Sequence, residues 1–320
     1  MSPVRVYLTG ATGFLGGNVA RVFAGREGAE LFCPVHRMAP PEDAPYAWER
    51  LDLTDAAAVE RSVASFRPDA IVHAAIRNDL LHLYADRVGA WEAYVGATRN
   101  LVDAANRHGA HMVLVSTDWV FDGTQSGATE DTPPNPINLY GFLKAASELV
   151  VTQRADRSAV ARVAAVNGVH LARPAAPRRQ DAGFGYLVGS LVESLRAGRP
   201  FAVWESPAIN MVATPTLASD AAGLLWRIAA SGHEGIFHCC GGESVDRGTL
   251  ARLAVEAFDL DGDLLQTGVP YPDDPPPAPV PFDTSLDARA TAERLGVELP
   301  TVRDQLGRMR AELESVEAAA

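Results

Sequence analysis

The chain has 320 residues, of which 47% are hydrophobic and 21% charged, and its formal net charge is −12. This size and composition suit one large α/β unit or two modest domains. An acidic chain repels phosphate backbones, so we expect no nucleic-acid partner, and no apolar run approaches the roughly 18 residues of a membrane span.

The cysteines and the N-terminus indicate the compartment. Cys33, Cys239 and Cys240 have neither a disulfide framework nor the spacing of zinc ligands, so we expect buried thiols and no metal site. The N-terminus leads directly into a strand without the apolar run of a signal peptide. Together these features predict a cytoplasmic protein.

Strands and helices alternate through the first half of the chain. Apolar strands are expected over residues 4–9, 30–35, 48–53, 69–75, 111–116 and 158–166. Helices are expected from near Phe14 to residue 24, from Asp55, and over residues 90–108 and 140–154. This alternation predicts βαβ units, and the continuous apolar runs predict strands covered on both faces. The fold class is therefore α/β, with a doubly wound parallel sheet of the Rossmann type.

The pattern is less regular after residue 167. Helices are expected over residues 185–197, 218–230, 249–258 and from Thr301, strands over 200–204 and 235–239, and loops over 170–184 and the proline-rich 270–281. We expect residues 1–167 to form a dinucleotide-binding domain. Residues 168–320 would mainly form a smaller α/β lobe over the C-terminal edge of the sheet, where such folds bind ligands, and some of its segments can return to the sheet.

A glycine motif lies between the first strand and the first helix. In TGATGFLG, Gly10 permits a tight turn, Gly13 lets the backbone approach a pyrophosphate, and Gly16 lets the helix pack closely on the sheet. The helix N-terminus then presents N–H groups and a positive dipole to the phosphates. The motif predicts a dinucleotide site made by Gly10, Thr12, Gly13, Phe14, Leu15 and Gly16.

The end of the second strand bears on the choice of cofactor. No acidic residue is present there to hold a ribose 2′-hydroxyl, whereas Arg37 can pair with a 2′-phosphate, which favours NADP over NAD. Asp52 and Leu53 end the third strand, where an adenine edge would lie. The small residues Ala74 and Ala75 end the fourth strand and let the cofactor pass.

Tyr140 and Lys144 are four residues apart, so they share one face of a helix, and Thr117 lies at the end of a strand. Lys144 is the only lysine among 28 lysine and arginine residues. Its ammonium and an oxidised nicotinamide ring are expected to lower the pKa of Tyr140, so that the phenol exchanges a proton near neutral pH. Thr117 would hold the substrate oxygen. The plain alternative is an amphipathic helix with a buried tyrosine and a solvated lysine.

Four segments in order, TGATGFLG, RPDAIVHAA, VSTDWVF and YGFLKAASE, resemble the extended short-chain dehydrogenase/reductases of the NAD-dependent epimerase/dehydratase superfamily over nearly the whole chain. STDWVFDG is most similar to the dTDP-4-dehydrorhamnose reductase branch, which usually has STDYVFDG. The resemblance implies catalytic roles for Thr117, Tyr140 and Lys144. It also implies an NAD(P)H-dependent reductase of a keto group, on a nucleotide-activated deoxysugar or a related specialised metabolite, and a homodimer.

The chain departs from that branch at two places. Tyr94 stands where the family usually has asparagine, which bears on the local helix geometry and on a proton-relay water. The tract from Asn210 reads NMVATPT in place of DQxGxPT, so the substrate need not be a dTDP-sugar. The candidate substrate residues are Asp118, Trp119, Arg173, Arg178 and Asn210.

Three other functions stay open. Sugar-nucleotide dehydratases usually have an Asp-Glu pair after the catalytic threonine, whereas here Asp118 is followed by Trp119, which cannot transfer protons. An epimerase would use the same tyrosine and lysine. A methionine adenosyltransferase regulatory subunit also resembles this branch, so a non-catalytic NADP-binding subunit is the third alternative.

Overall fold

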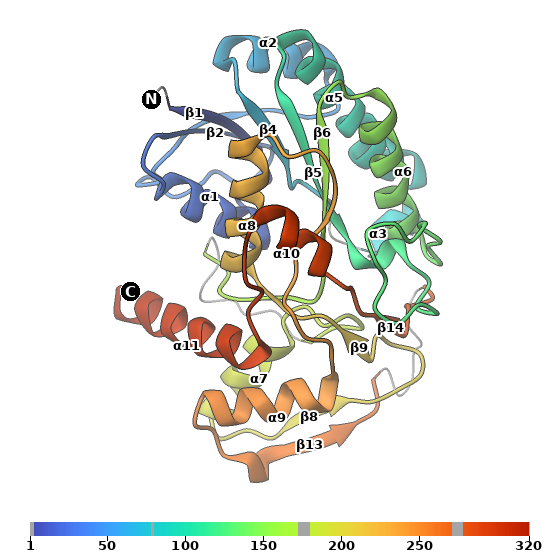
Figure 1. The fold of residues 1–320 in the computed structure, drawn as a ribbon. Coiled ribbons are helices and arrows are strands. Elements are labelled where there is room, and N and C mark those ends of the chain that lie inside the picture. The colour runs from blue at the N-terminus through green and yellow to red at the C-terminus, as the bar shows by residue number, and fades with distance from the viewer. Residues whose placement is uncertain (1–2, 78–79, 172–179, 271–277, 320) are drawn as a thin grey trace.

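A seven-stranded sheet forms the centre of the computed structural model, which describes residues 3–77, 80–171, 180–270 and 278–319 (Figure 1). The strands are all parallel and follow the order β11-β6-β5-β4-β1-β2-β3. Their bounds are β1 Val4–Thr9, β2 Ala29–Val35, β3 Ala47–Arg50, β4 Ala70–His73, β5 His111–Thr117, β6 Ser158–Val163 and β11 Gly235–His238. The predicted doubly wound α/β fold is confirmed.

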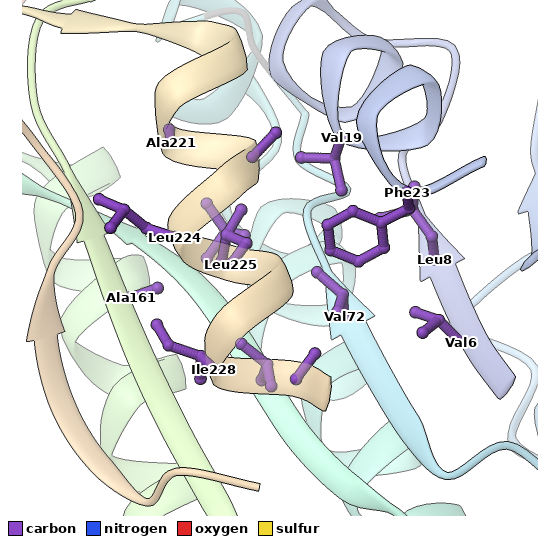
Figure 2. Close-up of a cluster of buried hydrophobic side chains, with 14 of the residues drawn as sticks. Val6, Leu8, Val19, Phe23, Val72, Ala161, Ala221, Leu224, Leu225 and Ile228 are labelled. Carbon is purple, nitrogen blue, oxygen red and sulfur yellow. The ribbon is translucent and has the colours of Figure 1, made fainter. Parts of the chain in front are cut away.

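Helices cover both faces of the sheet. Successive side chains of a strand point to opposite faces, so the apolar side chains of each strand pack against helices on both faces. Val6 and Leu8 of β1 pack towards α1 (Phe14–Ala24) and α8 (Ala218–Ser231), as Figure 2 shows for one face. Tyr7, between them, packs towards α2 (Ala56–Phe66) and α5 (Ala97–His108) on the other face. The long helix α6 (Leu139–Arg154) packs beside α5. This two-sided burial is the reason for the continuous apolar strands.

The helix predicted over residues 90–108 is not uniform. It consists of α4 (Arg87–Trp91), a π-helical turn (Glu92–Gly96) and α5, and the short α3 (Leu80–Ala85) precedes it. The π turn contains Tyr94, the residue at which the sequence departs from its relatives. A π turn inserts an extra residue into a helix and therefore changes which side chains face the sheet.

A smaller α/β region lies at the C-terminal ends of the strands (Figure 1). Its apolar core joins α7 (Leu187–Arg196), α9 (Arg247–Ala257) and α11 (Val302–Ala319). Short strands complete it: β7 Val166–Asn167 with β10 Thr216–Leu217, β8 Phe201–Trp204 with β13 Leu265–Gly268, and β9 Val212–Ala213 between β12 Val245–Asp246 and β14 Asp283–Thr284. Two 3₁₀ turns are present, at Asp118–Val120 and Gly262–Leu264.

The second half of the chain also contributes to the central sheet. Strand β11 pairs with β6 at its edge, α8 packs against α1, and α10 (Arg289–Leu295) contacts both α8 and β11. The division of the chain at residue 167 stays a prediction. Of the helices in the described part of the chain, none is both long and apolar enough to cross a membrane.

Candidate active site

The glycine loop lies against the end of β4. Gly10 has a φ of 80°, in the left-handed region that favours glycine, and a Cβ there would lie 2.7 Å from the amide nitrogen of Ala75. A Cβ on Gly16 would press into the carbonyl oxygen of Gly10. Thr9 holds the neighbouring backbone, because its hydroxyl accepts a hydrogen bond of 3.2 Å from the amide of Ala75. The loop therefore has the close backbone packing that the motif predicts.

Helix α1 begins directly after this loop. Gly13 precedes it in an extended conformation and offers no side chain to cap its first amides, and no acidic residue is present in its first turn. Such a terminus suits a phosphate group. Thr12, Phe14 and Leu15 are half-buried beside it, and the ring of Phe14 lies 4.9 Å from that of Tyr186 in the smaller region. The loop thus lies where the two parts of the chain meet.

Arg37 and Asp52 are brought together at the ends of adjacent strands. Arg37 is exposed, and its carbonyl accepts a hydrogen bond of 3.1 Å from Arg50. Hydrogen bonds from Thr54, together with the charges of His36 and Arg37, hold the pKa of Asp52 below its usual value. An exposed guanidinium at this edge fits a ribose 2′-phosphate. Leu53 is half-buried next to them, and its carbonyl accepts a bond of 3.0 Å from Asn100.

Thr117 lies between Asp118 and Tyr140 and hydrogen-bonds to both. Its hydroxyl donates to Oδ1 of Asp118 over 2.9 Å and accepts from the amide of Trp119 over 3.2 Å. Tyr140, at the start of α6, also hydrogen-bonds to Thr117. Burial raises the pKa of Tyr140 to about 12, against that hydrogen bond, which lowers it, and the Asp118 charge raises it further. Asp118 is 4% exposed, and burial raises its pKa to about 6.

Lys144 lies one turn after Tyr140 and is buried. Its ammonium donates a hydrogen bond of 2.5 Å to the carbonyl of Val115 on β5. Burial lowers the pKa of Lys144 to about 8, and the charge of Glu148 opposes this decrease. The pKa of Tyr140 is set by burial, by Thr117 and by Asp118, and not by Lys144. The side chains of the protein therefore do not lower the pKa of Tyr140 as expected. The effect expected from a bound nicotinamide ring stays a prediction.

Two aromatic side chains pack against Tyr140. The ring of Tyr94 lies 6.2 Å away at an angle of 81°, and that of Trp119 lies 6.0 Å away at 74°. Both are edge-to-face arrangements, the geometry that aromatic pairs prefer. The π turn brings Tyr94 to this position, and its hydroxyl donates to the carbonyl of Arg77 over 2.9 Å. Two edge-to-face ring contacts thus help to fix the orientation of Tyr140.

The candidate substrate residues divide into three groups. Asp118 and Trp119 adjoin Tyr140. Asn210 is 1% exposed, and its amide nitrogen donates bonds of 3.1 Å to the carbonyls of Val212, Pro281 and Phe282. Its side chain is therefore committed to the backbone, which corrects the expectation that it faces a substrate. Arg173 and Arg178 lie outside the described residues.

Two polar residues of the site were missed at the sequence level. Thr284 of β14 hydrogen-bonds to Asp118, although the two are far apart in the chain. His73 ends β4 and accepts or donates a bond of 2.7 Å with the hydroxyl of Thr9, and burial together with the Lys144 charge lowers its pKa to about 3. The position of His73 at a strand end was the only available signal, and Thr284 had none.

The chain is similar to known proteins over nearly its whole length. The family described as "RmlD substrate binding domain" matches residues 4–315. Methionine adenosyltransferase 2 subunit beta of Xenopus tropicalis is 29% identical over 301 residues, which cover 92% of this chain and 83% of that protein.

Two solved structures are also similar to nearly the whole chain. A hypothetical dTDP-4-dehydrorhamnose reductase from Sulfolobus tokodaii is 26% identical with a TM-score of 0.75, over 93% of this chain and 97% of that one. The dTDP-4-dehydrorhamnose reductase of Bacillus anthracis in complex with NADP has a TM-score of 0.78 at 20% identity, over 98% of this chain and 100% of that one. The second likeness is one of fold.

Proposed function

The chain belongs to the RmlD substrate binding domain family and has the extended short-chain dehydrogenase/reductase fold, and from this premise we propose that it reduces a keto group with NAD(P)H. The observation that carries the proposal is the arrangement of Tyr140 and Lys144 on helix α6 against strand β5. Tyr140 hydrogen-bonds to Thr117, the last residue of that strand, and the Lys144 ammonium bonds to the carbonyl of Val115, two residues earlier. This arrangement, together with the glycine loop in the same sheet, supports hydride-transfer chemistry over simple binding.

The residues of the first half fit a dinucleotide. The amides at the start of α1 would hold the pyrophosphate, and Ala74 and Ala75 would leave room for its passage. Arg37 would pair with a 2′-phosphate, which makes NADP the preferred cofactor over NAD. Lys144 would hold the nicotinamide ribose with its ammonium, which also donates to the carbonyl of Val115. The bound cofactor supplies the hydride.

Side chains of the protein would then transfer the proton to the substrate oxygen. Thr117 would orient the substrate oxygen by a hydrogen bond, and the Tyr140 hydroxyl would give that oxygen its proton. The flanking rings of Tyr94 and Trp119 would keep the phenol in one orientation and exclude water from it. A fixed, dry geometry of this kind is the main source of rate in such reactions.

The residue that follows Asp118 supports reduction over dehydration. Trp119 occupies the position where a dehydratase has a second acid, and it packs with the apolar residues Ala182, Ile209 and Val280. We propose a ketone on a nucleotide-linked deoxysugar or on a related specialised metabolite. Because the cysteines are buried thiols, we also propose a cytoplasmic location.

Oxidation of NADPH with a panel of keto substrates tests the proposal. We expect turnover with at least one dTDP- or UDP-linked 4-keto sugar or one non-nucleotide ketone, and its loss in Tyr140→Phe. Leu149→Ala is a matched control, since Leu149 is an exposed residue of the same helix that lies away from Thr117. Tight NADPH binding with no turnover across the panel would contradict the proposal.

That last outcome would support a second candidate. The similarity to a subunit of methionine adenosyltransferase 2 favours a non-catalytic NADP-binding regulatory role. In that case the dinucleotide would stabilise the fold, and Tyr140→Phe would bind NADPH as tightly as the unmodified chain. An epimerase, by contrast, would interconvert sugar nucleotides without net consumption of added NADPH.

A further inference from the structure

We infer that Asp118 is a proton store for this site, which returns a proton to Tyr140 through the hydroxyl of Thr117. The inference rests on the proposed keto reduction and adds to it a third member of the proton chain. Asp118 would not contact the substrate oxygen itself. It would act through Thr117, as a residue that sets the protonation of the tyrosine.

The first support is a continuous line of hydrogen bonds. Tyr140 bonds to Thr117, and the Thr117 hydroxyl donates to Asp118 over 2.9 Å. The Trp119 amide, 3.2 Å from the same hydroxyl oxygen, fixes where the threonine points. Thr117 and Asp118 are 5% and 4% exposed, so bulk water does not easily replace either partner. A hydroxyl that accepts from one group and donates to the next can pass a proton between them.

The second support comes from the far side of Asp118. Asp118 also hydrogen-bonds to the backbone amides of Asp118 and Trp119 and to Thr284, whose hydroxyl lies 3.3 Å from Oδ1 of Asn210. The Asn210 amide cannot turn over, because its nitrogen donates to three backbone carbonyls. Its oxygen is therefore a fixed acceptor for the single proton of Thr284. When Thr284 donates to Asn210, its own oxygen is left to accept a proton from Asp118.

This arrangement can serve both forms of the carboxyl group. An ionised Asp118 accepts from Thr117 and from Thr284. A protonated Asp118 has two possible acceptors for its one proton. It can donate to Thr284 while Thr284 donates to Asn210, or it can donate from Oδ1 to the oxygen of Thr117. In the second case the Thr117 proton is available first to the substrate oxygen and then to the phenolate. A buried acid with partners for both states can change its protonation without leaving an unpaired polar atom.

Burial favours the protonated form of Asp118, whereas the hydrogen bonds that the carboxyl group accepts favour the ionised form. Tyr140 faces it from α6, Cys240 from the segment after β11, and Thr284 from β14. Tyrosine and cysteine can add negative charge when they ionise, and Thr284 adds none. Among the described residues no cation acts on Asp118, so burial outweighs the hydrogen bonds that lower the pKa and raises the pKa of this carboxyl to about 6.

The proton movement balances as follows. When the substrate carbon receives hydride, the Tyr140 O–H bond breaks and its proton goes to the substrate oxygen. The Thr117 proton then passes to the phenolate oxygen, and the Asp118 proton passes to the oxygen of Thr117. The tyrosine is neutral again, and Asp118 is left as a carboxylate that takes one proton from solvent after the product departs. The transfer is downhill, since Asp118 is a far stronger acid than Tyr140.

A pH profile of Asp118→Asn tests the chain of transfer. In the unmodified enzyme we expect kcat for keto reduction to fall above about pH 6, as Asp118 loses the proton that it supplies. In Asp118→Asn that limb should vanish, and kcat below pH 6 should fall by about 10- to 100-fold, the lower range of a general acid's contribution. Asp122→Asn is the matched control, since Asp122 bonds to Thr124 at the surface, and it should keep the limb. An unchanged limb in Asp118→Asn would overturn the inference.

Infrared titration of the protein without substrate gives a readout that needs no turnover. We expect a protonated carboxyl band that disappears as the pH passes about 6, is absent in Asp118→Asn, and moves to higher pH in Thr284→Val because the carboxylate loses a donor. Turnover without such a band would refute the proton store and leave the reductase standing. A band without turnover on any ketone would refute the reductase and leave the titrating carboxyl standing.

Discussion

Glu148→Gln tests how far the site depends on a buried ion pair beneath it. Glu148 is one turn after Lys144 on α6, and its two carboxylate oxygens accept hydrogen bonds of 3.0 and 2.8 Å from Nε and Nη2 of Arg162 on β6. The two side chains are 5% and 0% exposed. The Arg162 guanidinium also lies 5.1 Å from the centre of the Phe121 ring. The pair therefore connects α6 to the sheet at the point where Lys144 is held.

The expected cost follows from the burial. Replacing the carboxylate with an amide leaves a guanidinium charge with no counter-charge in a site that water does not reach, which costs about 3–5 kcal/mol of the free energy of unfolding. A chain of 320 residues has an unfolding entropy of about 0.7 kcal/mol/K, so the melting temperature should fall by about 4–7 °C. The pKa of Lys144 should also fall further below its present value of about 8, because the Glu148 charge supports it.

Urea unfolding followed by circular dichroism measures the change. Asp103→Asn is the matched control, because Asp103 pairs with Arg154 of the same helix over 2.9 Å, with side chains that are 34% and 53% exposed. An exposed pair of this kind contributes about 0–1 kcal/mol. Equal losses of unfolding free energy in Glu148→Gln and Asp103→Asn would refute the reasoning. It would also be refuted if the double variant Glu148→Leu/Arg162→Met, which removes both charges, were less stable than Glu148→Gln alone.

Four further predictions concern the site. Gly16→Ala should weaken NADPH binding by about 1–3 kcal/mol in calorimetry, because its Cβ would press on the Gly10 carbonyl, whereas Gly17→Ala should not, since its Cβ would lie 3.4 Å from Ala11. Arg37→Ala should weaken NADPH binding about 10- to 100-fold but leave NADH binding unchanged, and equal losses would contradict a 2′-phosphate contact. Lys144→Arg should lose most activity yet still unfold cooperatively, because the arginine fork is a poor substitute for a compact ammonium; wild-type turnover would remove Lys144 from the mechanism. The raised pKa of Asp118 means that its contribution to stability is present below pH 4 and lost as the pH rises through 6; against Asp118→Asn, the unmodified chain should lose about 3 kcal/mol over that range, and a flat difference would contradict the shift.

The sequence alone was sufficient for the central sheet and for the parts of the site that are local in the chain. Continuous apolar runs separated by helices specify a parallel sheet buried on both faces, and the structure confirms it. The glycine loop is also a local feature, because one turn needs a left-handed residue at Gly10 and close packing at Gly16. Tyr140 and Lys144 share a helix face by spacing alone.

Contacts between distant parts of the chain required the folded structure. No pattern in the sequence relates Asp118 to Thr284, or turns Asn210 inward so that its amide binds backbone. The π turn at Tyr94 was equally hidden, because a single turn of different winding is too short to be recognised from hydrophobic periodicity. Local spacing therefore determined which residues could do the chemistry. The tertiary fold decided their pKa values, because burial and long-range hydrogen bonds arise only when the second half of the chain closes over the ends of the strands.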